Sequence, residues 1–211
     1  MTQYFEVHAR NPQPRLIQQA AELLREGGLL VYPTDSTYAL GCALQATAAQ
    51  ERLRQVRQLE LRHDLSLLFA DISQVADYAK VDNAAFRLLK QATPGPFTFI
   101  LPASRDVPRK LADPRKKTIG IRIPAHPVSH ALLAAFGEPL LSSTLTLPGD
   151  DLVMSDPADI RDRLKRQVDL ILDGGAGGLE PSTVLDLTVW PPQIIRLGCG
   201  DPASIGIEGQ V

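Results

Sequence analysis

Apolar and polar residues follow two periods along the chain, one typical of helices and one typical of strands. Helical spacing predicts helices at 14–26, 47–58, 83–91, 127–136 and 157–167. Short runs rich in β-branched and aromatic residues predict strands at 29–33, 65–70, 97–101, 118–124, 139–145, 168–173, 182–187 and 193–197. Helices and strands interleave without a strict one-to-one order. We therefore expect an α/β fold with a twisted, mixed β-sheet and helices packed on it.

The predicted elements follow one another without an internal repeat or a linker. Helix boundaries coincide with residues that favour them, such as Asp82 before one helix, and Pro127 and Gly137 at the two ends of another. The chain of 211 residues is long enough to bury a sizeable core without disulfides. We expect a single domain over residues 1–211, with its core at about residues 10–200.

Composition narrows the class of protein. The net charge of −2 excludes a uniformly basic protein that coats nucleic acid. Cys42 and Cys199 form neither a disulfide framework nor a metal-ligand spacing, and His126 and His130 have no acidic residue between them, so we expect no metal site. The chain has no segment typical of a signal peptide or a membrane span. We therefore expect a cytoplasmic protein that does not enter a membrane.

The stretch VYPTDSTYALGC at 31–42 places a cluster of hydrogen-bonding side chains at the end of a buried strand. Open α/β sheets bind their ligands at such positions. The alternative is a turn whose Ser, Thr and Asp side chains satisfy only their own backbone. From the sequence alone, that alternative is at least as well supported.

A basic segment at 105–122 contrasts with the net charge of the chain. Its cations are Arg105, Arg109, Lys110, Arg115, Lys116, Lys117 and Arg122. Arg109, Lys110, Arg115, Lys116 and Lys117 form a candidate patch for RNA or phosphate. The alternative is a solvated basic loop, and for Arg115 to Lys117 the two interpretations are equally good. Arg122 differs, because it interrupts an apolar strand and a buried guanidinium requires an anionic partner.

Two further strands carry polar residues in positions suited to a cleft. Alternation along 142–149 places Ser142, Thr144 and Thr146 on one face and Ser143 on the other. The alternative there is an exposed strand face. Ser182 and Arg196 stand in apolar strands and could face the same cleft as Arg122. The run GGAGG at 174–178 lacks the strand and helix context of a dinucleotide-binding fold.

Four segments resemble, in order and spacing, the motifs of the YrdC/YciO family of threonylcarbamoyl-AMP synthases. YPTDSTYALGC is similar to the family's YPTDTVYGLG, TPGPFTFIL to WPGPLTLVL, TIGIRIPAHP to TVGVRxPxHP, and PSTVLDLT…IIRLG to STVVDLT…ILRPG. More narrowly, the chain resembles the YciO branch, whose members lack the extra C-terminal domain of longer relatives. The resemblance implies a YrdC-like fold with a concave basic cleft.

The same resemblance implies an activity. Family members condense L-threonine, bicarbonate and ATP, the last with Mg²⁺, to threonylcarbamoyl-AMP and release pyrophosphate. The product serves modification of adenosine 37 in tRNA, which makes tRNA and the other proteins of that modification the expected partners. Double-stranded RNA is a further candidate partner, because family members share a concave surface with RNA-binding proteins.

The resemblance also assigns roles by position. Ser36, Arg122, Thr144 and Ser182 would bind L-threonine, with Arg122 pairing the carboxylate. Arg57, His63, Thr118, Thr146 and Arg196 would line the nucleotide site. Arg57 and Arg122 would act in catalysis, which depends mainly on positioning and on charge stabilisation.

Two motifs depart from the family pattern. The family's Lys-x-Arg is Arg57-Gln58-Leu59 in this chain, so one cation is replaced by an apolar residue. The family's Ser-x-Asn is Thr144-Leu145-Thr146, so a carboxamide is lost. Losing one charge-assisted hydrogen bond to a phosphate costs about 1.5–3 kcal/mol. We therefore expect synthase activity weaker than that of the typical family member.

Two other functions are consistent with these residues. One is an RNA-binding protein that uses the basic segment and forms no adenylate, with steeply salt-dependent binding. The other is an enzyme that cleaves threonylcarbamoyl groups. Retention of Ser36, Arg122 and Ser182 beside the loss of a cation at Leu59 suits recognition of the threonyl end better than recognition of a triphosphate.

Overall fold

The computed structural model describes residues 2–59, 65–105, 107, 117–150 and 152–207. Its strands are β1 (Gln3–Glu6), β2 (Leu30–Pro33), β3 (Tyr38–Ala43), β4 (Ser66–Leu68), β5 (Phe97–Pro102), β6 (Thr118–Arg122), β7 (Leu140–Thr144), β8 (Leu170–Asp173), β9 (Thr183–Asp186) and β10 (Gln193–Arg196). Its α-helices are α1 (Pro14–Arg25), α2 (Thr47–Arg57), α3 (Val75–Tyr78), α4 (Asn83–Ala92), α5 (Pro127–Phe136) and α6 (Pro157–Leu164). Short 3-10 helices lie at Ile72–Gln74 and Pro202–Ile205.

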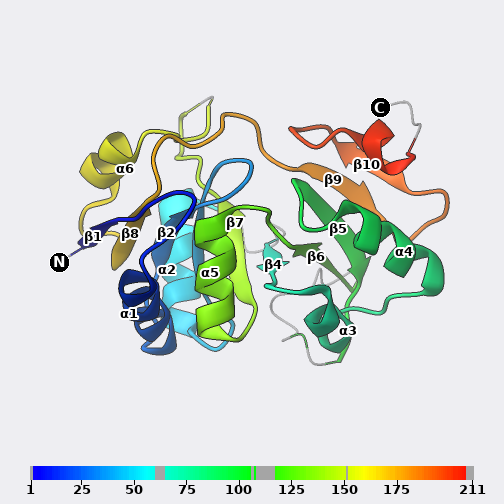
Figure 1. Ribbon diagram of the computed structural model, residues 1–211, viewed down its shortest axis with the longest axis horizontal. Coiled ribbons are helices and arrows are strands. Elements are labelled where there is room, and N and C mark those ends of the chain that lie inside the picture. Colours follow the sequence, from blue (N-terminus) through cyan, green and yellow to red (C-terminus); the bar gives the residue numbers. More distant parts are fainter. Residues whose placement is uncertain (1, 60–64, 106, 108–116, 151, 208–211) are drawn as a thin grey trace.

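All these strands belong to one sheet, in the order β1-β8-β2-β3-β7-β4-β6-β5-β9-β10. Parallel pairs such as β4 with β6 and β5 with β9 stand beside antiparallel pairs such as β3 with β7 and β5 with β6. The expected single α/β domain with a mixed sheet is therefore confirmed (Figure 1).

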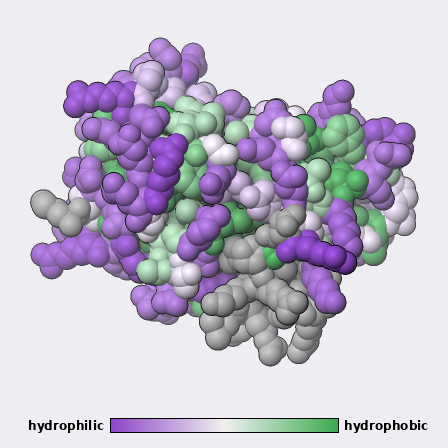
Figure 2. All heavy atoms as spheres, turned by 90° about the horizontal axis from the view of Figure 1, so that it is seen from below, coloured by the Kyte–Doolittle hydropathy of each residue, from purple (hydrophilic) through white to green (hydrophobic). Residues whose placement is uncertain are grey.

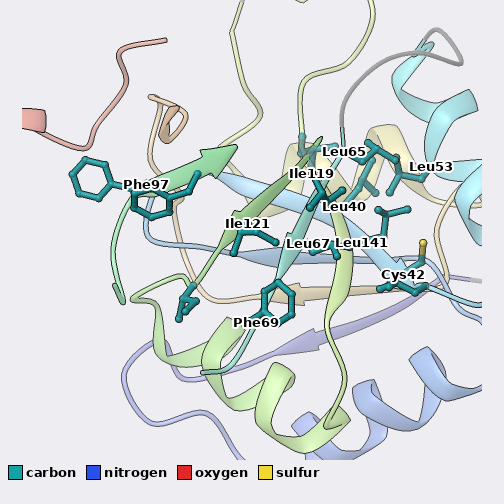
Figure 3. Close-up of a cluster of buried hydrophobic side chains, with 14 of the residues drawn as sticks. Leu40, Cys42, Leu53, Leu65, Leu67, Phe69, Phe97, Ile119, Ile121 and Leu141 are labelled. Atoms are coloured by element: carbon teal, nitrogen blue, oxygen red, sulfur yellow. The ribbon is translucent and has the colours of Figure 1, made fainter. Parts of the chain in front are cut away.

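Helices cover both faces of the sheet. On one face, α1 and α5 pack next to each other and bury side chains such as Leu24 and Leu132 against β2, β3 and β8. On the other face, α2, α4 and α6 contribute to a second core that includes Leu53 and Leu89. Figure 3 shows part of this second core, where Leu141, Leu67 and Ile121 of the neighbouring strands β7, β4 and β6 lie side by side. Burial of these apolar side chains is the main force that holds the layers together.

Several helix ends are fixed by the residues that the sequence suggested. The Asp82 carboxylate accepts hydrogen bonds from the first-turn backbone N–H groups of Ala84 and Ala85 at 2.9 and 2.8 Å. At α5, Pro127 occupies the first turn, and Gly137 takes a left-handed φ of 84° that ends the helix. These local signals explain why the helix boundaries agree with the sequence pattern to within a few residues.

The sequence pattern did not indicate β1, β3 or α3. β3 has the sequence YALGCA, and its Ala, Gly and Cys side chains give little strand signal. Its Gly41 is needed for close packing, since a Cβ there would lie 2.7 Å from a ring carbon of Tyr32. Tertiary packing therefore determines this strand.

Most large apolar side chains among the described residues are buried, although a few, such as Leu152, Leu179 and Trp190, are exposed. The face seen from below in Figure 2 is mostly hydrophilic over the residues that the structure describes. Within those residues, no helix combines the length and the apolar character that crossing a membrane requires.

Candidate functional site

A cavity of about 600 Å³ lies over the part of the sheet where β7, β4, β6, β5 and β9 follow one another. Three arginines reach it, namely Arg57, Arg122 and Arg196. Its hydroxyl side chains are Thr37, Ser66, Thr98, Thr118, Ser142, Ser143, Thr144, Thr146 and Ser182. Among the described residues that line it, none is a carboxylate. A cavity with this balance of charge favours an anionic ligand.

The floor of the cavity is built from small residues in register on neighbouring strands. Ser142 of β7 lies opposite Ser66 of β4, and Ser66 lies opposite Gly120 of β6. A Cβ at Gly120 would lie 2.7 Å from the Ser66 hydroxyl oxygen. Glycine at this position therefore leaves room for the serine and keeps the floor open.

The cavity also extends around the ends of these strands. Ser143 has Leu40 of the second core as its register partner, so its Cβ lies on the opposite face from Ser142 and Thr144. Ser143 nevertheless lines the cavity, as does Ile119 near the start of β6. The prediction that Ser143 lies on the other face of the strand from Ser142 and Thr144 is confirmed. The cavity nevertheless reaches Ser143, because it continues past the strand ends toward Arg57 at the end of α2.

Arg122 is surrounded by the turn between β2 and β3. The residue is only 6% exposed, and its Nη2 lies 2.5 Å from Asp35 Oδ1, 2.9 Å from Ser36 Oγ and 3.2 Å from Thr34 Oγ1. The second oxygen of Asp35 accepts a hydrogen bond from the backbone N–H of Ala125 at 3.0 Å. As expected for a buried guanidinium, Arg122 thus has an anionic partner.

One buried donor of Arg122 has no partner among the residues that the structure describes. Its Nε is buried and makes no hydrogen bond within the part of the chain that the structure describes. A buried polar group without a partner is rare in folded proteins and costs about 1–3 kcal/mol. Because Arg122 lines the cavity, a ligand oxygen that accepts from Nε would remove this cost.

The proposed threonine-binding residues differ in whether their side chains line the cavity. Thr144 and Ser182 line the cavity beside Arg122, and the Ser182 hydroxyl lies 2.8 Å from that of Thr98. Ser36 is 3% exposed and is not among the described residues that line the cavity. Its hydroxyl instead contacts the Arg122 guanidinium, so Ser36 helps to hold Arg122 in position.

Sequence reasoning did not assign Asp35, Thr37, Ser66 or Thr98 to the site. Asp35 and Thr37 belong to the polar run of 32–38, which was the available signal, but the run does not show which side chains face the cavity. In the structure, Thr37 lines the cavity, whereas Asp35 binds Arg122.

Of the proposed nucleotide-binding residues, Thr118 and Thr146 line the cavity. Arg57 Nε donates to Ser143 Oγ at 3.2 Å, and its Nη1 donates to the carbonyl of Thr146. Burial lowers the pKa of the Arg57 guanidinium, which still remains charged at neutral pH. Arg57 therefore brings a positive charge to the cavity and ties the end of α2 to the segment after β7.

Arg196, the last residue of β10, also lines the cavity. Its Nη2 donates to the carbonyl of Ser182 at 2.7 Å. Burial and, secondarily, the charge of Arg122 lower the pKa of Arg196. Repulsion between the two cations favours an anion placed between them.

The predicted site also includes a histidine and a run of basic residues. His63, Arg109, Lys110, Arg115 and Lys116 lie outside the described residues. Lys117 is described, with a left-handed φ of 55° and a carbonyl that accepts from Ala103 N–H at 2.8 Å. The RNA or phosphate patch remains a prediction.

At Leu59, an apolar residue replaces a cation of the family pattern, and the structure places this side chain against the core. Gln58 adopts a left-handed conformation at the end of α2, and Leu59 packs against the second core. Leu59 is not among the described residues that line the cavity. In addition, no group of three or more His, Cys, Asp or Glu side chains within the described ranges could hold a metal ion.

Comparison with known proteins agrees with this arrangement. The family model Sua5_yciO_yrdC, described as telomere recombination, matches residues 22–198. The chain is 51% identical to the YciO protein of Escherichia coli K12 over 201 residues, which are 95% of this chain and 98% of that protein. The crystal structure of E. coli YciO superimposes with a TM-score of 0.93 at 50% identity, covering 97% of this chain and 100% of the other.

Two more distant relatives carry names that describe an activity or a ligand. A protein of Halorhodospira halophila named threonylcarbamoyl-AMP synthase is 35% identical over 172 residues, which are 81% of this chain and 89% of that protein. The crystal structure of P. abyssi Sua5 complexed with L-threonine is 30% identical, with a TM-score of 0.86, and covers 93% of this chain and 58% of the other. The chain belongs to the Sua5/YciO/YrdC family.

Proposed function

We propose that this protein binds L-threonine at Arg122 and condenses it with bicarbonate and ATP to form threonylcarbamoyl-AMP and pyrophosphate. The observation that carries the proposal is the buried Arg122, which lines a cavity rich in arginine and whose Nε lacks a partner among the described residues. A relative with the name of this synthase and a Sua5 structure with L-threonine support it.

The reaction consists of two bond-forming steps. The amine nitrogen of threonine attacks the carbon of bicarbonate, water leaves, and a carbamate forms. A carbamate oxygen then attacks the α-phosphorus of ATP, and the bond to the pyrophosphate leaving group breaks. Both steps need correct placement of the reactants and stabilisation of negative charge.

Each part of the cavity has a role in this scheme. Arg122 would pair the carboxylate of threonine, and the hydroxyls of Thr144 and Ser182 would contact its polar groups. Arg57 and Arg196 would face the phosphates. Since no described residue lining the cavity is a carboxylate, Mg²⁺ would be held by the phosphates of ATP, whose charge it would partly neutralise. The product would supply tRNA modification in the cytoplasm.

The test is pyrophosphate release by the purified protein with ATP, Mg²⁺ and bicarbonate, with and without L-threonine. We expect release that depends on threonine and is abolished by Arg122→Ala. Absence of release from a folded protein that binds threonine would overturn the synthase activity. Salt-dependent RNA binding without any threonine binding would instead favour an RNA-binding protein.

Cleavage of a threonylcarbamoyl group is a second candidate function, supported by the position of Leu59. Where the family pattern has a cation, this chain has an apolar side chain packed against the core. A site with fewer contacts to a triphosphate still retains the threonine end. Incubation with tRNA that carries the threonylcarbamoyl group, followed by nucleoside analysis, separates cleavage from synthesis.

Restoring the missing cation should strengthen the synthase activity. We expect Leu59→Arg to raise kcat/KM for ATP by about 10- to 100-fold, the equivalent of one charge-assisted hydrogen bond of about 1.5–3 kcal/mol. The KM for threonine should change little. Steady-state pyrophosphate release at varied ATP measures the effect.

Leu59→Gln is the matched control, because it removes the same apolar contact without adding charge. An equal gain in both variants would mean that release of Leu59 from the core matters rather than its charge. No gain in a folded Leu59→Arg protein would contradict the assignment of this position to phosphate binding.

A further inference from the structure

The connection from β8 to β9 crosses the molecule. These strands are separated by six others in the sheet, and the connection runs across the top of the molecule in Figure 1, in orange, from one group of strands to the other. It begins with Gly174–Gly178, the GGAGG run, which we call the glycine strap. The proposed function assigns no role to this run.

The strap lies against the turn that holds Arg122. A Cβ at Gly178 would lie 1.9 Å from the carbonyl oxygen of Ser36, far inside van der Waals contact. At Gly177, a Cβ would lie 2.7 Å from a ring carbon of Tyr38. Glycine is therefore required because the backbone of the strap is in direct contact with the turn.

Hydrogen bonds hold the strap in this position. The hydroxyl of the fully buried Tyr38 donates to the carbonyl of Gly175 at 2.7 Å and accepts from the N–H of Gly174 at 3.1 Å. Burial raises the pKa of this phenol, so it keeps its proton at neutral pH. The N–H of Gly177 donates to the carbonyl of Ser155 at 2.8 Å. The strap is thus held by hydrogen bonds to both Tyr38 and Ser155.

At its other end, next to β9, the connection packs closely against a second glycine, Gly198. A Cβ at Gly198 would lie 2.0 Å from the carbonyl oxygen of Pro181. The next residue, Ser182, lines the cavity, and its carbonyl accepts from Arg196. The connection therefore links the turn that supports Arg122 to another residue of the proposed threonine site.

We propose that the glycine strap is a positioning element of the amino-acid site, with Gly178 fixing the turn that orients Arg122. Ser36 lies between the two, because its carbonyl oxygen meets Gly178 and its hydroxyl contacts the Arg122 guanidinium. A methyl group at 178 must displace either the strap or Ser36. A shift of Ser36 changes the direction of the Arg122 donors and weakens their grip on a carboxylate. The inference rests on the proposed function, because it concerns the same carboxylate anchor.

Calorimetric titration of the full chain with L-threonine tests the inference. We expect Gly178→Ala to weaken threonine binding on the order of tenfold or more, because small misplacements of a binding group have large effects. The Tm should fall, because the new methyl group clashes with the backbone of Ser36, whereas binding of a non-hydrolysable ATP analogue to the folded variant should stay close to wild type. Ala176→Ser adds one atom at an exposed position of the same strap and should leave threonine binding unchanged.

A double-mutant cycle with Ser36→Ala shows whether the effect passes through Ser36. We expect the two substitutions to be non-additive, as for residues in contact. If Gly178→Ala does not fold, Tyr38→Phe removes the two hydrogen bonds between the Tyr38 hydroxyl and the strap without added bulk and should weaken threonine binding several-fold.

The inference alone is overturned if wild type binds threonine and Gly178→Ala binds it equally well. Equal loss of threonine and nucleotide binding, or additive effects in the cycle, would also overturn it, since both indicate a general structural role. Failure of the wild-type protein to bind threonine would overturn the proposed function itself.

Discussion

Replacement of Arg122 by lysine is expected to weaken binding of L-threonine by about 10- to 100-fold in a protein that remains folded. Lysine keeps a positive charge beside Asp35, so the buried carboxylate retains a partner. It has no planar fork, however, and cannot supply the Nε donor that is unpartnered among the described residues. A carboxylate would lose its two-point contact. Calorimetric titration with L-threonine measures the loss.

Arg196→Lys is the matched control for this experiment. Arg196 also lines the cavity, but its guanidinium contacts the Ser182 carbonyl rather than the turn at 34–36. We expect Arg196→Lys to weaken ATP binding and to leave threonine binding nearly unchanged. Wild-type affinity for threonine in Arg122→Lys would show that Arg122 is not the carboxylate anchor.

The elements that the sequence predicted are those with strong local signals. Capping by Asp82 and the Pro127 and Gly137 boundaries of α5 act within a single turn, so the sequence reveals them. β3 lacks such a signal, because its small side chains are required by contacts with Tyr32 on the neighbouring strand. Contacts between distant segments cannot be read from one segment alone.

The site residues also divide into those that a local sequence signal reveals and those that depend on contacts between distant segments. Arg122 could be predicted, because a single charge in an apolar strand needs a partner wherever the chain folds. The division of labour within the turn could not be predicted, since Thr37 faces the cavity while Ser36 and Asp35 face Arg122. The sequence did not indicate a role for the glycine strap. That role depends on a backbone contact between Ser36 and Gly178, which are 142 residues apart in the chain.

These contacts give the cavity its electrostatic character. Asp35 is the carboxylate nearest to Arg122, and it binds Nη2 together with two hydroxyls. Its second oxygen is held by the Ala125 N–H, just before α5. The pair therefore orients the guanidinium, while Nε, which has no partner among the described residues, stays available to a ligand. We also expect the Arg122–Asp35 pair to contribute to the free energy of unfolding.

Asp35→Ala is expected to lower the free energy of unfolding by about 3–5 kcal/mol, because it leaves a buried charge without its partner. The side chains of Arg122 and Asp35 are only 7% and 12% exposed, so water compensates for little of the loss. Urea denaturation of wild type and variant measures the difference.

Two further variants separate the charge from the hydrogen bonds. Asp35→Asn keeps an acceptor near Arg122 and should destabilise the protein less than Asp35→Ala. Asp35→Ala combined with Arg122→Leu removes both charges and should recover much of the lost stability, because replacing a whole buried pair costs far less than breaking it. Equal stability of Asp35→Ala and wild type would show that the guanidinium finds another partner or water. In that event the turn at 34–36 would not orient Arg122, and the fixed direction of its Nε would need a different cause.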